Sequence, residues 1–196
     1  MRAARILCLS LLVAACGPTL APTATVSPSD SPSYVASAPR IAPPPVSPPT
    51  PPGTNLPAFA CADVSGGKTG VANAVTARVA EQPGYDRFVL QFDSPVPSYT
   101  VKRQATPTFT SGASGQTITL SGTSGVLVNV QTATGANTYT GSTDLTNDQY
   151  LVLKEARQTQ DFEGHLSWGL GLGKPACMRV FTLTDPDRLV VDFSTT

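Results

Sequence analysis

Apolar and polar residues alternate through most of residues 58–196, and turn-forming residues separate the alternating stretches. A period of two places successive side chains on opposite faces of an extended chain, so each stretch predicts a β-strand with one buried face. None of the stretches has the periodicity of an amphipathic helix. The pattern predicts strands at residues 71–80, 87–92, 99–103, 117–120, 126–130, 151–156, 166–172, 179–183 and 189–193.

Gly, Pro, Ser and Asp cluster between the predicted strands. Residues 82–84 (Gln-Pro-Gly) and 184–187 (Thr-Asp-Pro-Asp) predict two hairpin turns, and residues 111–115 and 121–125 predict two more. Residues 131–147 are rich in Thr, Gly and Asn and predict a long loop. Short strands joined by frequent turns are typical of an antiparallel β-sandwich, so the expected fold class is all-β.

Proline is concentrated before this domain. Thirteen of the 19 prolines lie between Pro18 and Pro57, and the only charged residues in that segment are Asp30 and Arg40. Proline fixes φ and lacks a backbone donor, which prevents a helix or a central strand from forming. The composition predicts a disordered, semi-rigid linker over residues 16–57, followed by a folded domain at residues 58–196.

The first residues have the layout of an export signal. Arg2 and Arg5 precede an apolar run at residues 6–13, which is too short to span a bilayer. The Val-Ala-Ala-Cys sequence that ends at Cys16 resembles the lipobox of bacterial lipoproteins. This resemblance implies that residues 1–15 are a lipoprotein signal peptide and that acyl chains on Cys16 anchor the protein at the extracytoplasmic face of the cell membrane. The alternatives are an ordinary secretory signal and an uncleaved anchor.

Two of the four cysteines are expected in the exported domain. Cys8 lies within the signal and Cys16 is the lipidation candidate, which leaves Cys61 and Cys177. An even number of cysteines in an oxidising compartment predicts a disulfide between these two residues. A pair of buried free thiols and a reactive or metal-binding pair are the alternatives.

Charge and histidine content limit the function. The chain has 13 basic and 13 acidic residues, so its formal net charge is zero, which argues against a nucleic acid as partner. His165 is the single histidine, and there is no Gly-x-Ser-x-Gly sequence. A zinc hydrolase needs several His or Glu ligands, and a serine hydrolase needs a nucleophile elbow. We therefore predict no catalytic residue, no metal site and no cofactor.

A short pattern occurs twice in the domain. Residues 86–92 (Asp-Arg-Phe-Val-Leu-Gln-Phe) and 187–193 (Asp-Arg-Leu-Val-Val-Asp-Phe) each follow a predicted turn. Each copy predicts a strand with alternating faces, in which the arginine bonds to loop carbonyls or to a neighbouring carboxylate. The repetition suggests a pseudo-symmetric pair of sheets, and coincidence between two ordinary hairpin strands is the alternative.

The second copy carries a family resemblance. Residues 186–193 resemble the closing strand of AMIN domains, which are non-catalytic β-sandwich modules of N-acetylmuramoyl-L-alanine amidases and secretins. The order of residues 84–92, 96–101, 161–171 and 178–183 is similar to that in AMIN-like lipoproteins of actinobacteria-type organisms. The resemblance implies an AMIN-like β-sandwich at residues 58–196 that binds peptidoglycan or another wall polymer. It does not imply amidase activity, and we expect no amidase domain after Thr196. A protein-interaction module of an envelope complex is the alternative function.

One short segment combines the side chains that a glycan site needs, because sugar rings stack on aromatic faces and polar groups bond to hydroxyls. Residues 161–168 contain two aromatic residues, two carboxylates and the histidine. In the alternative interpretation Phe162 and Trp168 belong to the core and the charged residues form its rim. The candidate ligand-binding residues are Asp161, Phe162, Glu163, His165 and Trp168, with Tyr85 and Tyr99 as further candidates.

Overall fold

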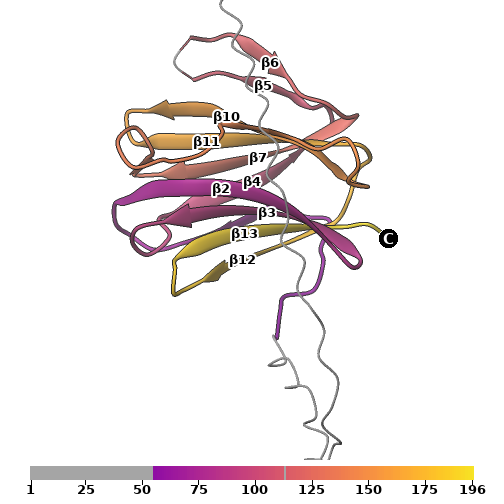
Figure 1. Ribbon diagram of the computed structural model, residues 1–196, viewed down its shortest axis with the longest axis horizontal. Coiled ribbons are helices and arrows are strands. Elements are labelled where there is room, and N and C mark those ends of the chain that lie inside the picture. Colours follow the sequence, from indigo (N-terminus) through magenta and orange to yellow (C-terminus); the bar gives the residue numbers. More distant parts are fainter. Residues whose placement is uncertain (1–54, 113) are drawn as a thin grey trace, which may run out of the picture. The chain divides into compact units, whose positions relative to one another are not determined.

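Two β-sheets packed face to face form the part of the chain that the computed structural model describes, which is residues 55–112 and 114–196 (Figure 1). The predicted antiparallel β-sandwich is confirmed. The expected signal peptide, Cys16 and the linker up to residue 54 lie outside the described residues. No helix within residues 55–112 and 114–196 is long and apolar enough to cross a membrane.

The first sheet has six strands in the order β1-β4-β7-β11-β10-β9, and the second has five in the order β12-β13-β3-β2-β8. A hairpin of two short strands, β5 and β6, lies above the larger sheet in Figure 1. Neighbouring strands are antiparallel except β2 and β8. The strands are β1 (Val64–Gly66), β2 (Ala72–Gln82), β3 (Tyr85–Phe92), β4 (Tyr99–Gln104), β5 (Thr108–Thr110), β6 (Thr117–Thr119), β7 (Ser124–Gln131), β8 (Ala133–Thr134), β9 (Asp144–Thr146), β10 (Leu153–Phe162), β11 (His165–Leu172), β12 (Met178–Leu183) and β13 (Arg188–Ser194).

Each strand predicted from the alternating pattern has a counterpart, but one of them is much longer than expected. The strand predicted at residues 151–156 is β10, which continues to Phe162 opposite His165 of β11. Its second half is polar and contains a register shift between Gln158 and Gln160, so the apolar alternation stops although the pairing continues. The segment predicted as a loop at residues 131–147 contains the short strands β8 and β9.

The two Asp-Arg copies lie in β3 and β13, which are neighbours in the five-stranded sheet. The prediction of a pseudo-symmetric pair of sheets is therefore wrong, because both copies belong to the same sheet. The prediction for the arginines is confirmed. Arg87 binds the carboxylate of Asp192, and Arg188 Nε donates to the Pro186 carbonyl at 3.0 Å.

The core lies between the two sheets and is built from their inward-facing side chains. Trp168 of β11 and Phe88 of β3 have no exposed surface, and their ring centroids are 5.5 Å apart. Tyr139, from the segment between β8 and β9, also packs against the Trp168 ring, at a centroid distance of 6.0 Å. The indole is therefore enclosed by residues of both sheets and of a connecting segment.

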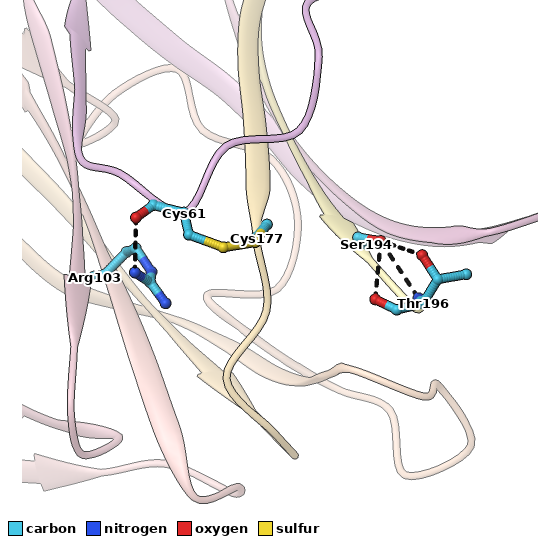
Figure 2. Close-up of a disulfide and its surroundings, with 5 residues drawn as sticks. All are labelled: Cys61, Arg103, Cys177, Ser194 and Thr196. Atoms are coloured by element: carbon cyan, nitrogen blue, oxygen red, sulfur yellow. Dashed lines mark hydrogen bonds between the residues drawn. A yellow bond between two sulfur atoms is a disulfide. The ribbon is translucent and has the colours of Figure 1, made fainter.

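Cys61 and Cys177 form the predicted disulfide, which joins residues separated by 116 positions (Figure 2). The cross-link attaches the segment before β1 to the start of β12. Two backbone hydrogen bonds between Ala60 and Met178, of 2.8 and 3.0 Å, extend this attachment. In the chain-entropy model, closing a loop of this length stabilises the fold by about 4–5 kcal/mol.

A buried carboxylate connects the two sheets. Asp86 of β3 has no exposed surface, and its Oδ2 atom accepts hydrogen bonds from the backbone N–H groups of Val152 and Leu153 at 2.7 and 2.9 Å. Leu153 is the first residue of β10 in the other sheet, and Val152 directly precedes it. The two hydrogen bonds to Oδ2 replace part of the hydration that the side chain loses on burial, while Oδ1 has no partner among the described residues, so the bonds to Oδ2 favour this meeting point of the two sheets.

Replacing Asp86 should weaken the fold without affecting the surface. In Asp86→Ala the two N–H groups lose their acceptor, and we expect the free energy of unfolding to fall by about 3 kcal/mol. Glu81→Ala is the matched control, because Glu81 lies opposite Asp86 in β2 but is exposed. Urea unfolding followed by circular dichroism measures both variants. Equal stabilities of the two variants would contradict the structural role of Asp86.

Candidate binding surface

Three aromatic rings and two guanidinium groups alternate on the outer face of the five-stranded sheet. We call Phe59, Tyr85, Arg87, Arg179 and Phe181 the arginine–aromatic face. The Arg179 Cζ atom lies 4.6 Å from the ring centroids of both Phe59 and Tyr85. The Arg87 Cζ atom lies 5.1 Å from the Tyr85 centroid and 5.6 Å from that of Phe181. These distances are within the range of cation–π interaction.

The strand register places this group on one side of the sheet. Arg87 of β3 pairs with Asp192 of β13, and Asp192 pairs in turn with Arg179 of β12. Side chains directly opposite one another in neighbouring strands lie on the same face. The residues adjacent in sequence, Phe88 and Val191, belong to the core, so the row from Arg87 to Arg179 faces outward.

Asp192 holds both guanidinium groups in fixed positions. Its side chain has no exposed surface, and it accepts two hydrogen bonds from Arg87, at 2.6 and 2.9 Å, and one from Arg179 Nε at 2.7 Å. Hydrogen bonding to Asp192 raises the pKa of Arg87 above its ordinary value. The arginine side chains keep 23% and 13% of their surface exposed. The cations are thus preorganised while part of each remains accessible.

The face is positively charged. Arg78 and Arg188 lie opposite the outward-facing residues Val89 and Gln91, so they add two cations to the same side of the sheet. Asp192 is the one acidic residue at the outward-facing positions of β2, β3, β12 and β13. Guanidinium groups bind carboxylates and phosphates in bidentate fashion, and the adjacent rings offer flat apolar surfaces. The arrangement suits an anionic polymer that contains sugar rings.

The structure changes the interpretation of Trp168. The tryptophan has no exposed surface and lies on the inner face of β11, together with Leu166, Leu170 and Leu172. It cannot stack on a ligand in this position, so its assignment as a contact residue is wrong and the alternative, a core residue, is correct. Tyr99 is also buried, and its ring lies against Gly66, where an added Cβ atom would be 2.6 Å from the tyrosine Oη. Burial raises the pKa of Tyr99.

The two candidate carboxylates near the tip of the β10–β11 hairpin, Asp161 and Glu163, have separate environments. Asp161 accepts hydrogen bonds from Thr134 Oγ1 at 2.7 Å and from the backbone N–H of Gly135 at 2.9 Å, which fixes the segment after β8. Glu163 lies in the turn, with a positive φ of 52°, rather than on the strand beside Asp161. The two side chains therefore do not form a pair on one strand face.

Phe162, Glu163 and His165 remain at the exposed tip of this hairpin. Phe162 is 52% exposed and pairs with His165 across the turn. Tyr85 is half-buried and belongs to the arginine–aromatic face. The structure thus places the accessible candidates from the sequence on two separate surfaces.

Sequence reasoning missed Phe59, Arg179 and Phe181 as surface candidates. The alternation of Arg179, Val180 and Phe181 does predict that Arg179 and Phe181 share a face. Their proximity to Arg87 could not be found this way, because it depends on the pairing of β12 and β13 with β3. Within residues 55–112 and 114–196, no three His, Cys, Asp or Glu side chains form a group that could hold a metal ion.

Comparison with known families gives one match. The family model of the AMIN-like domain matches residues 72–195, which is more than half of the chain. The matched region begins with β2 and ends after β13, so it includes both Asp-Arg copies. No curated protein matches the sequence.

Substitutions at the two aromatic residues of the hairpin should separate core from surface. Trp168→Ala removes a fully buried indole, and we expect the free energy of unfolding to fall by about 3–5 kcal/mol. Phe162→Ala removes an exposed ring, and we expect a change within about 0.5 kcal/mol. Urea unfolding followed by far-UV circular dichroism compares the variants. A Trp168→Ala protein as stable as the parent would contradict the assignment of Trp168 to the core.

Proposed function

The chain belongs to the AMIN-like domain family, whose domain is a non-catalytic module, and we propose that it is a lipid-anchored envelope protein that binds peptidoglycan or another wall polymer. We assign this binding to the arginine–aromatic face. The observation that carries the proposal is the alternation of rings and guanidinium groups around the buried carboxylate of Asp192.

The physical match lies in the two kinds of group that a wall polymer presents. Its sugar rings have apolar faces that can stack on Phe59, Tyr85 and Phe181, and its peptide carboxylates or phosphates can pair with the arginines. Both contacts can form together because the rings and cations alternate over distances of 4.6–5.6 Å. Since Asp192 already orders Arg87 and Arg179, little side-chain entropy is lost on binding.

The lipid anchor is supported by the sequence before the domain. The lipobox-like residues end at Cys16, and the proline-rich segment follows directly. At about 3.1 Å per residue, an extended segment of this length reaches on the order of 100 Å. This reach would let a module attached to a membrane contact a wall polymer at some distance from the lipid surface.

Binding to the wall polymer can be tested by sedimentation with purified sacculi. We expect the detergent-solubilised full chain to co-sediment and the Phe59→Ala/Phe181→Ala double variant to bind roughly tenfold more weakly or worse. The double variant removes two rings but no charge, and Phe162→Ala is the matched control. Raising the salt concentration should also weaken binding, because it screens the guanidinium contacts.

Two results of this experiment would contradict the assignment. Loss of binding in Phe162→Ala but not in the double variant would move the contact to the tip of the β10–β11 hairpin. No retention of the parent protein above an albumin control would argue against a wall polymer. Crosslinking in native membranes would then test the alternative, an envelope protein as partner. Circular dichroism confirms that each variant is folded.

Lipidation has a separate test. We expect cells fed an alkynyl fatty acid to label the parent protein and to place it in the membrane fraction. Cys16→Ser should remove the label, because the thiol that receives the lipid is lost. Cys8→Ser is the matched control and should keep both the label and the location. Equal labelling of the parent and the Cys16→Ser protein would contradict the proposed site.

A further inference from the structure

A cavity of about 420 Å³ lies at one end of the sandwich, between the ends of β4, β7 and β11 and the connection from β11 to β12. Its volume is within the range of small-molecule sites. It contains no residue of the arginine–aromatic face or of the hairpin tip. Its lining includes Arg103, Ser124, Val126, Leu172, Pro175 and Ala176.

Two polar residues interrupt the apolar inner face at this cavity. Inward-facing positions along β4, β7 and β11 are apolar except at Arg103 and Ser124. Arg103 pairs with Val126, and Ser124 pairs with Leu172, so both follow the register of core residues. Polar residues that break an inner-face pattern without a packing reason are expected at functional sites.

Ser124 places an unpaired polar atom in the wall behind the cavity. The residue is 5% exposed, and its Oγ atom has no hydrogen-bond partner within the described part of the chain. Buried hydroxyl groups are nearly always hydrogen-bonded, because an unpaired one loses its hydration without compensation. The Oγ atom itself has almost no accessible surface, so a ligand in the cavity would reach it only after a rotation of the Ser124 side chain.

Arg103 brings a positive charge to the same cavity. Its Nη1 atom donates to the Cys61 carbonyl at 2.9 Å, which positions the guanidinium beside the disulfide (Figure 2). The backbone N–H of Arg103 donates to Asp63 Oδ1 at 2.9 Å. The side chain is exposed and forms no ion pair among residues 55–112 and 114–196. A guanidinium has five N–H donors, so most of them remain for a ligand.

We propose that the cavity binds a small molecule with a carboxylate at one end of an apolar body. The carboxylate pairs with Arg103, and the apolar body contacts Val126, Leu172 and Ala176. A free fatty acid and the C-terminus of a peptide with small side chains both have this chemistry. This inference goes beyond the proposed wall binding, since it uses a different part of the domain.

Calorimetric titration of the full chain with water-soluble probes tests the inference. Hexanoate represents the fatty-acid source, and N-acetyl-dialanine, in its D,D and L,L forms, represents the peptide source. Hexanamide and the dialanine amide have the same bodies without the charge. We expect at least one carboxylate to bind about tenfold more tightly than its amide, because a hydrogen bond to a charged group is the stronger kind. The probe that binds identifies the source.

Three variants locate the site. Arg103→Gln removes the positive charge but keeps a side-chain amide donor, and it should remove the preference for the carboxylate over the amide. Ala105→Trp places a large ring at an exposed position of the cavity lining and should abolish binding of both forms. Lys102→Gln is the matched control. It removes a cation from the residue that directly precedes Arg103 in β4 and lies on the opposite face of the strand.

The inference is overturned if neither carboxylate binds, if each binds no better than its amide, or if Arg103→Gln leaves the preference unchanged. Each variant is also tested for co-sedimentation with sacculi. Normal sacculus binding together with lost carboxylate binding supports a separate site. Failure of the parent protein in the sacculus assay leaves the titration result unaffected, so the two proposals can fail independently.

Discussion

The buried carboxylate of Asp86 is the contact on which the arrangement of the two sheets depends. It is fully buried, and its two backbone donors come from the start of β10 in the opposite sheet. An apolar contact between the sheets could shift by a fraction of a side chain at little cost. Asp86 cannot shift in the same way, because moving its Oδ2 atom away from the two N–H groups would break both of its hydrogen bonds inside the core. Asp86 thus determines the position at which β3 and β10 meet.

The residue after Asp86 in β3 belongs to the candidate binding surface on the outside of the sheet. Arg87 follows Asp86 directly, so it faces outward, where it meets Asp192 of the neighbouring strand. The aspartate of β13 takes the opposite face from that of β3. Asp192 faces outward, and the next residue, Phe193, lies opposite Asp86 and faces the core. Stability and the candidate binding surface therefore use alternate residues of the same strands. A substitution on one face can leave the other intact, which is the reason that core and surface variants are separable.

Local sequence signals predicted the elements of this fold but not their partners. Alternation located the strands at 71–80, 87–92 and 166–172 because one face of each is buried. The same alternation places Trp168 on one face with Leu166, Leu170 and Leu172, so the sequence did contain the signal that this tryptophan lies in the core. The ion pair between Arg87 and Asp192 joins residues 105 positions apart and depends on the order of strands in the sheet. For the same reason, Arg103 could be recognised as an inward-facing cation only after β4 was paired with β7.

The disulfide is placed where it affects both candidate sites. Cys61 lies two residues after Phe59, which closes one end of the arginine–aromatic face, and the Cys61 carbonyl accepts a hydrogen bond from Arg103 at the cavity. The segment around Cys61 pairs with β12 only at Ala60, and β1 pairs with β4 over three residues. Such short pairing would hold the segment weakly without a covalent bond. Under the proposed anchoring, tension along the linker would enter the domain at this segment. The cross-link to Cys177 would then carry the load and keep Phe59 and Arg103 in place.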